Sequence, residues 1–212
     1  MAKVAVVTPD RAREVLSPPG FAGTGRVKCY LGGDRDPLHL HLHTLAPGEA
    51  LGIGPQAADC VAYVWRGDVV AGGVALTAGS SAIVEHGEAL ALRAGSAEAQ
   101  VLTFAAARAD RQSRPGGHVH LLPGERVPRL ESLPGSGGVG GGIHADSACP
   151  TCEVWLHENS FPGGTEYSPE AAARGIHSHS EDEIIFITRG EIRLGAELFP
   201  AGTAVGIAAD TL

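Results

Sequence analysis

The stretch Gly175-Ile-His-Ser-His-Ser-Glu-Asp-Glu-Ile-Ile-Phe-Ile-Thr-Arg-Gly190 places two histidines and a carboxylate close together before an apolar run. His177 and His179 are two residues apart, so on a strand both imidazoles point to one face, about 7 Å apart along the chain. Glu183 begins the apolar run, which predicts a buried strand. A carboxylate at the start of a buried strand is costly unless a cation compensates its charge. The three side chains therefore predict a site for a divalent transition metal, with coordination positions left open for water or substrate.

The spacing resembles the first signature of the cupin superfamily, which is a glycine, His-x-His, three residues, Glu, six residues and Gly. The match falls on His177, His179, Glu183 and Gly190, while Gly175 lies closer to the first histidine than in the usual family pattern. The resemblance implies an all-β fold of cupin β-barrels, also described as an RmlC-like jelly roll or double-stranded β-helix. It also implies one divalent transition metal ion per chain. The ligand types accept Fe, Mn, Ni, Co, Cu or Zn and do not select among them.

Length and composition agree with a β-rich protein. The 212 residues suit one large or two small domains, at about 100–200 residues per domain. Thirty glycines and 14 prolines separate short apolar segments, which favours many short strands over helices. Hydrophobic residues make up 43% of the chain, enough for an ordinary core.

The sequence also limits location and partners. The apolar run at the N-terminus is too short for a signal peptide, and no run reaches the roughly 20 residues that span a bilayer, so we expect a cytoplasmic protein. Four cysteines are too few for a disulfide framework in a chain of this length. A net charge of −8 without a Lys/Arg cluster predicts no binding to nucleic acid or to membranes. The expected partner is a small-molecule ligand or substrate.

An internal repeat predicts two tandem copies of one domain. The segment 119–135 aligns with 4–20 at an offset of 119 − 4 = 115, and Gly190 aligns with Gly67 at an offset of 190 − 67 = 123. The second copy therefore carries an insertion of 123 − 115 = 8 residues. We expect an N-terminal barrel over 1–106, a linker over 107–117 and a C-terminal barrel over 118–212, the arrangement of a bicupin. The glycine-rich segment 134–142 is expected to be a mobile loop.

The two copies differ in the residues that bind metal. The first copy has Gly54, Gln56 and Cys60 at the positions of His177, His179 and Glu183, so its barrel is expected to lack a metal at this site. It is then a structural partner, or it holds an apolar or hydrogen-bonded ligand.

A second cupin signature supplies a fourth ligand, a histidine eleven residues after its first glycine. Starting from Gly202, this histidine would be residue 202 + 11 = 213, one position after Leu212. The equivalent residue of the first copy is Leu90, and two expected strands, 89–93 and 99–104, lie there without a counterpart in the second copy. The C-terminal barrel is thus expected to be incomplete at its C-terminus, or closed by another segment.

The alternating segment His39-Leu-His-Leu-His43 places three imidazoles on one face of a strand and leucines on the other. One interpretation is that the leucines face the core and the histidines face solvent or a subunit interface. The other is an accessory metal site, which would need a further carboxylate or cysteine. Four other histidines are expected on the surface or in loops: His86, His118, His120 and His144. His157 is expected in a strand over 153–158.

Cys149-Pro-Thr-Cys152 is a lone Cys-x-x-Cys motif. A structural zinc site needs two further ligands, and a thioredoxin-type redox pair lies at the start of a helix. Neither context is visible around the motif, so we expect two loop thiols just before a strand over 153–158. Trp155 and His157 lie on one face of that strand; if this face is the barrel interior, His157 contacts substrate or supports a metal ligand, and otherwise it is an ordinary core residue.

The function that the resemblance implies is that of a metal-dependent, dioxygenase-like oxidoreductase acting on a small oxygen-bearing molecule. Glu183 is then a metal ligand and a candidate catalytic proton acceptor. Two other functions fit the same residues: a non-catalytic cupin that binds a small molecule, and a metal-dependent isomerase or lyase. Proteins that resemble cupins often pair through exchanged edge strands, which implies a homodimer.

Overall fold

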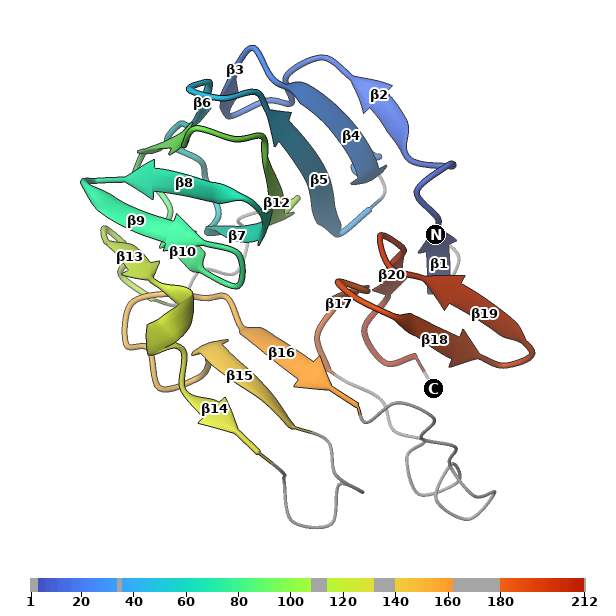
Figure 1. Ribbon diagram of the computed structural model, residues 1–212. Helices are drawn as coiled ribbons and strands as arrows, with labels where there is room; N and C mark the ends of the chain where they lie inside the picture. The colour runs from blue at the N-terminus through green and yellow to red at the C-terminus, as the bar shows by residue number, and fades with distance from the viewer. Residues whose placement is uncertain (1–3, 34–35, 108–113, 132–139, 162–179, 212) are drawn as a thin grey trace.

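The computed structural model of the protein describes residues 4–33, 36–107, 114–131, 140–161 and 180–211 (Figure 1). Strands dominate these ranges, which contain one three-residue 3-10 helix, η1 (Gly124–Arg126), and no α-helix. The predicted all-β fold is confirmed. No helix in the described residues is long and apolar enough to cross a membrane.

The first half of the chain folds into two antiparallel sheets. The seven-stranded sheet has the order β13 (Val119–Leu122), β10 (Ser81–Val84), β7 (Cys60–Arg66), β12 (Ala99–Ala106), β5 (Leu38–Leu45), β4 (Arg26–Leu31) and β2 (Arg13–Val15). The five-stranded sheet has the order β3 (Phe21–Gly23), β6 (Ala50–Ile53), β11 (Leu90–Ala94), β8 (Asp68–Ala71) and β9 (Val74–Thr77). The strands expected over 89–93 and 99–104 are β11 and β12.

The second half contributes smaller sheets. One three-stranded sheet has the order β14 (Arg129–Leu130), β15 (Gly140–Ala145) and β16 (Leu156–Ser160). Another has the order β1 (Val4–Val7), β20 (Ala204–Ile207) and β17 (Glu183–Phe186). A two-stranded sheet consists of β18 (Glu191–Leu194) and β19 (Glu197–Pro200). Two elements of this half have other bounds than the sequence predicts. The strand expected over 153–158 begins at Leu156, and Gly140 to Gly142 of the expected loop belong to β15. A Cβ on Gly141 would overlap the carbonyl oxygen of Glu158, so β15 and β16 approach too closely for a side chain there.

Each half donates its first strand to the other. β1, at the N-terminus, pairs with β20, and β13, which opens the second half, pairs with β10 of the first. Figure 1 shows β1 lying beside the red strands of the second half. Val119 and Leu121 of β13 pack on the core of the first half, so neither half has a complete sheet without a strand from the other.

The strands repeat at the offset that the sequence predicts. β7, β8, β9 and β10 begin 123 residues before β17, β18, β19 and β20, since 183 − 60, 191 − 68, 197 − 74 and 204 − 81 all equal 123. Gly67 and Gly190, which directly precede β8 and β18, have φ of 73° and 74°. Only glycine adopts this left-handed conformation without steric cost. The turn therefore explains why both copies carry glycine there.

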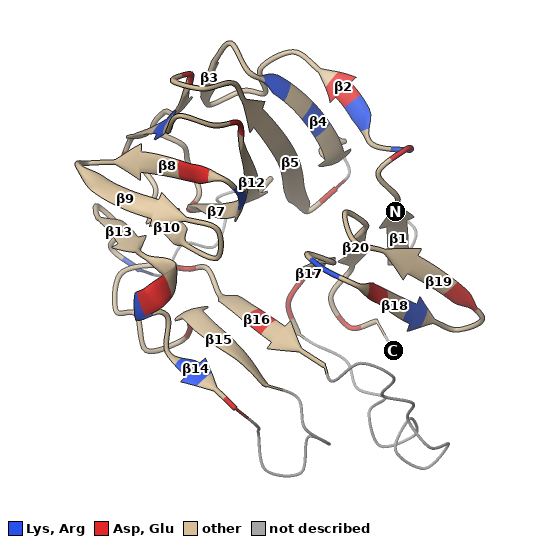
Figure 2. Cartoon of the chain, viewed as in Figure 1, with Lys and Arg blue, Asp and Glu red and all other residues tan. Residues whose placement is uncertain are grey.

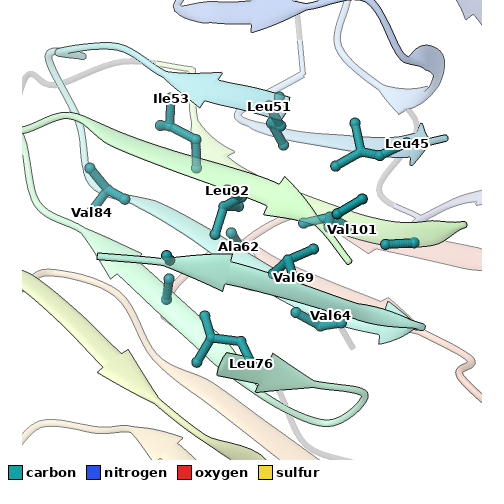
Figure 3. Packing of buried hydrophobic residues seen from close by; sticks show 14 of the residues in the cluster. Leu45, Leu51, Ile53, Ala62, Val64, Val69, Leu76, Val84, Leu92 and Val101 are labelled. Carbon is teal, nitrogen blue, oxygen red and sulfur yellow. The ribbon is translucent and has the colours of Figure 1, made fainter. Parts of the chain in front are cut away.

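An apolar core fills the space between the two sheets of the first half (Figure 3). The opposite face of the seven-stranded sheet is also covered, because it packs on the second half. There Leu40 and Leu102 are 0% and 1% exposed, and Ala204 of β20 and Phe186 of β17 pack with them. Trp65 of β7 adds a hydrogen bond from Nε1 to the carbonyl oxygen of Thr188 at 2.9 Å.

Burial of both sheet faces corrects one expectation for β5. Leu40 and Leu42 face the second half, while His41 and His43 point into the first barrel, where they are 6% and 2% exposed. His43 Nε2 lies 3.0 Å from the hydroxyl of Thr103. Burial, followed by repulsion from the neighbouring imidazole, lowers the pKa of His41 to about 4 and that of His43 to about 3. Both rings are therefore neutral at pH 7, and the expectation that they face solvent or a subunit interface was wrong.

Leu40→Ala should destabilise the protein by about 2–5 kcal/mol, because it removes a fully buried side chain from the contact between the halves. Urea-induced unfolding followed by tryptophan fluorescence measures the change. Val70→Ala is the control, since Val70 is 43% exposed and its change should stay within about 0.5 kcal/mol. Equal effects of the two substitutions would contradict a packed interface at Leu40.

Candidate functional site

Glu183 is the one predicted metal ligand that lies within the described residues. It opens β17, is half-buried, and pairs with Ile207 of β20. The loop before it is held in place by Asp182, whose Oδ1 accepts a hydrogen bond from the amide of Ala209 at 2.9 Å. His177 and His179 lie outside the described residues.

The register of β17 shows where Glu183 stands in the sheet. Cys60 pairs with Val84 in the first half, and Glu183 pairs with Ile207 in the second. Each residue of the second pair lies 123 positions after its counterpart in the first pair, since 183 − 60 = 207 − 84 = 123. Cys60 is 1% exposed inside the apolar core, where burial raises the pKa of its thiol to about 12. Glu183 therefore occupies the position from which the first half directs a side chain into its barrel.

Trp155 and His157 lie on the face of the second half that is turned away from the first. The alternate residues Leu156 and Glu158 contact the first half: Leu156 packs on its outer apolar cluster, and Glu158 accepts a hydrogen bond from Tyr63. A bulge repeats in both halves, pairing Cys29 with His41 before Leu31 with Leu40, and Ile143 with His157 before Ala145 with Leu156. His157 thus corresponds to His41, which points into the first barrel.

A second group of reactive side chains surrounds Glu85, which follows β10 and has no exposed side-chain area. Its Oε1 accepts hydrogen bonds from His120 Nε2 and Thr151 Oγ1, both at 2.6 Å. Its Oε2 accepts one from the amide of His118 at 2.9 Å and lies 3.2 Å from His118 Nδ1. Burial raises the pKa of Glu85, but these donors outweigh it and hold the pKa below its ordinary value. The buried carboxylate is therefore ionised at neutral pH.

The Cys-x-x-Cys motif lies against this carboxylate. The ligand atoms of Glu85, Cys149 and Cys152 are all within 4.8 Å of one another, and they form the one such group of three metal-ligating side chains among the described residues. Burial raises the pKa of Cys149, but hydrogen bonds from Cys152 and Thr151 outweigh burial and lower the pKa to about 7. Cys152 is 2% exposed, and burial with the neighbouring thiol raises its pKa to about 12.

A third polar group connects Tyr63 of the first half with the second. Its hydroxyl donates to Glu158 Oε1 at 2.6 Å, and Arg129 forms an ion pair with Oε2 of the same carboxylate. His144 Nδ1 lies 2.9 Å from the hydroxyl of Ser81. Its Nε2 is 3.4 Å from Glu158 Oε1 but is poorly aligned for a hydrogen bond. This group holds β15 and β16 against β7 and β10.

Three sequence expectations change with this geometry. His144 is buried and His120 lies in β13 against a buried carboxylate, so neither is a surface or loop residue, whereas His118 is exposed in the loop before β13, as expected, and contacts the same carboxylate. The Cys-x-x-Cys motif gains a third candidate ligand from another part of the chain. The accessory metal site at His39, His41 and His43 is not among the candidate groups of the described residues. The spacing His118-x-His120 was the signal that could have drawn attention to Glu85.

Positive charge does not collect on one face of the described structure. In Figure 2 the Lys and Arg positions lie on the neighbouring strands β2 and β4 of the first half and, away from these, on β14 and β18 of the second. This distribution agrees with the scattered basic residues of the sequence.

Comparison with solved structures shows the fold. Protein Ylba from E. coli matches with a TM-score of 0.65 and 17% identity, over 97% of this chain and 83% of that one. A protein from Pseudomonas aeruginosa described as glyoxylate induced matches with a TM-score of 0.71 and 14% identity, over 99% and 81%. A protein from Nostoc punctiforme described as a dioxygenase matches with a TM-score of 0.53 and 11% identity, over 97% and 75%.

No family model matches the sequence, and no curated protein matches it. At these low identities the solved structures establish the fold alone, a cupin-type jelly roll.

The Glu158 group predicts a loss of stability in acid. Burial raises the pKa of Glu158, but the nearby His144 ring and the hydrogen bonds from Tyr63 and Arg129 lower it from 4.5 to about 2. A carboxyl with a depressed pKa in the folded state stabilises the protein above pH 4.5, and the contribution is lost as pH falls toward 2. Urea midpoints measured at pH 7, 5, 4 and 3 should therefore fall less steeply in Glu158→Gln than in the wild type.

The matched control for this experiment is Glu191→Gln, which removes an exposed carboxylate of β18. It should leave the wild-type pH dependence unchanged. Parallel curves for wild type and Glu158→Gln would contradict the assignment.

Proposed function

We propose that the second half of the chain binds one divalent transition metal through His177, His179 and Glu183 and that this centre catalyses the oxidation of a small oxygen-bearing molecule, as a dioxygenase does. The observation that carries the proposal is the register of β17. It gives Glu183 the place in its sheet that Cys60, a buried residue of the first barrel's interior, has in the other.

The donor set fits such an ion. Two neutral imidazoles and one carboxylate leave coordination positions open, which is the ligand combination of non-haem iron sites and is also compatible with Mn, Ni, Co, Cu or Zn. A carboxylate at the start of a half-buried strand gains a compensating charge from the cation. The fold resemblance to a protein described as a dioxygenase adds support for this reaction class.

The proposal gives a role to Glu183, to the two residues Trp155 and His157, and to the first half as a whole. When bound, the metal supplies Lewis-acid or redox chemistry to a chelated substrate. Glu183 holds the ion and is positioned to accept a proton from a substrate hydroxyl. Trp155 and His157, on the face turned away from the first half, are available to contact substrate. The first half, whose interior is filled by apolar side chains, positions β17 through the exchanged strands.

We also propose that the chain is a bicupin, with barrels over 1–106 and 118–212 joined by the linker 107–117. The repeated strand positions at an offset of 123 support this division. The first barrel lacks the ligand set, because Gly54, Gln56 and Cys60 stand at the equivalent positions.

The double variant His177→Ala/His179→Ala should bind one equivalent less of divalent metal per chain than the wild type, because two of three ligands are lost. Elemental analysis after loading with Mn(II) and gel filtration measures the content. His39→Ala is the control, since it removes an imidazole of the first half that does not belong to the proposed ligand set. Equal metal content in the double variant and the wild type would refute the site.

The reaction class is tested by oxygen uptake. Protein loaded anaerobically with Fe(II), Mn(II) or Ni(II) is mixed with catechols, flavonols, β-diketones or hydroxy acids, and oxygen consumption is recorded. Uptake should fall by about 100-fold or more in Glu183→Gln, the low end of what a positioned proton acceptor contributes. Glu191→Gln, which changes charge on the exposed face of the same half, should keep full uptake.

Other outcomes would decide against the dioxygenase. Conversion of a substrate without oxygen consumption would favour an isomerase or lyase. Tight binding of a ligand without turnover under any of the metals would favour a non-catalytic binding protein.

A further inference from the structure

The contact between the halves contains side chains that suit a second metal ion. Glu85 comes from the first half, and Cys149 and Cys152 come from the loop between β15 and β16 of the second. Their carboxylate oxygen and two sulfur atoms lie within 4.8 Å of one another, close enough for one ion to contact all three after small side-chain rotations. The four cysteines of the chain are all free thiols, so both sulfurs are available as ligands.

The loop that carries the two thiols is held in a fixed conformation. The amide of Cys152 donates to Cys149 Sγ at 3.3 Å, and a backbone donor of this kind stabilises a thiolate. The start of the loop is shaped by a local bond from the amide of Ala148 to Asp146 at 2.9 Å, and its end is anchored to the first half, where the amide of Glu153 donates to the buried Asp59 at 2.7 Å. The thiols are thus held within the loop and against the first half.

The carboxylate is oriented in the way that metal ligands usually are. Glu85 receives hydrogen bonds from His118, His120 and Thr151, and these donors fix both of its oxygens. The two oxygens offer about four acceptor positions and already have four partners, so an ion would replace the longest of these contacts, the one of 3.2 Å from Oε2 to His118 Nδ1. Partners that orient a ligand in this manner are a regular feature of metal centres.

We propose that Cys149, Cys152 and Glu85 bind a zinc-class divalent ion that joins the two halves of the chain. Two thiolates select a borderline or soft ion such as Zn(II) over Mg(II) or Ca(II). Three protein ligands leave one tetrahedral position for water or for His120, which is already hydrogen-bonded to Glu85. The role is structural, because the ion would connect the end of β10 with the loop before β16.

This centre is independent of the proposed catalytic site and has a spectroscopic signature of its own. The protein is stripped with a chelator, reduced, and titrated anaerobically with Co(II) in the His177→Ala/His179→Ala background, which removes the other ligand set. One equivalent should bind with near-ultraviolet thiolate-to-cobalt charge-transfer absorption, and Zn(II) should displace it. Zinc should also raise the melting temperature of the stripped protein.

The matched variants separate the cysteines. Cys149→Ser should lose most of the charge-transfer absorption, whereas Cys29→Ser, which removes a buried thiol of the first half, should retain it. In case the serine variant does not fold, zinc-dependent protection from iodoacetamide is measured on the wild type by peptide mass spectrometry. Zinc should slow alkylation of Cys149 at least tenfold, with no effect at Cys29.

Several results would overturn the proposal. Co(II) binding without sulfur charge transfer would place the ion on other ligands. Alkylation of Cys149 at the same rate with and without zinc would exclude thiolate ligation. Reduced protein that binds no Co(II) in this background would refute the site. Purified protein with a Cys149–Cys152 disulfide that persists with zinc under reducing conditions would assign the pair to redox chemistry instead.

Discussion

Exchange of the first strand of each half is the constraint on which the rest of the structure depends. β1 completes the sheet of β20 and β17, and β13 completes the sheet of β10 and β7. The exchange fixes the two halves face to face, so the outer face of the seven-stranded sheet carries a buried apolar cluster as its inner face does. An ordinary antiparallel sheet leaves one face in water. Here the polar residues of the outer face must find partners within the protein, and this requirement creates the Glu85 and Glu158 groups.

Glu85 illustrates the cost of that burial. Removing a carboxylate from water is unfavourable by several kcal/mol unless hydrogen bonds or a cation replace its hydration. Three side chains from the second half supply donors to it. Glu158 shows the reverse arrangement: this carboxylate belongs to the second half, and Tyr63 of the first half donates a hydrogen bond to it. The two halves are therefore joined by reciprocal polar contacts as well as by the apolar cluster around Leu40.

The sequence predictions were accurate where a feature depends on residues close together in the chain, and they failed where it depends on contacts between distant segments. Gly67 and Gly190 are required by a local backbone conformation, so comparing them revealed the offset at which the strands repeat. Alternation in β5 correctly grouped the three histidines on one face, but alternation cannot tell which face is turned inward when both are buried. The Glu85 group was missed because its members come from three separate segments, and the topology of the exchanged strand brings His118 and His120 to Glu85.

The two faces of the second half have different tasks under the proposed functions. Leu156 and Glu158 of β16 face the first half, whereas His157 of the same strand and Trp155 just before it face away. The thiols of Cys149 and Cys152 approach Glu85 on the side of the interface, and Glu183 takes the position that faces a barrel interior in the first half. The proposed structural ion and the proposed catalytic one therefore depend on different segments, the loop before β16 and the start of β17. A change in the catalytic ligands then need not disturb the contact between Glu85 and the thiols that joins the halves.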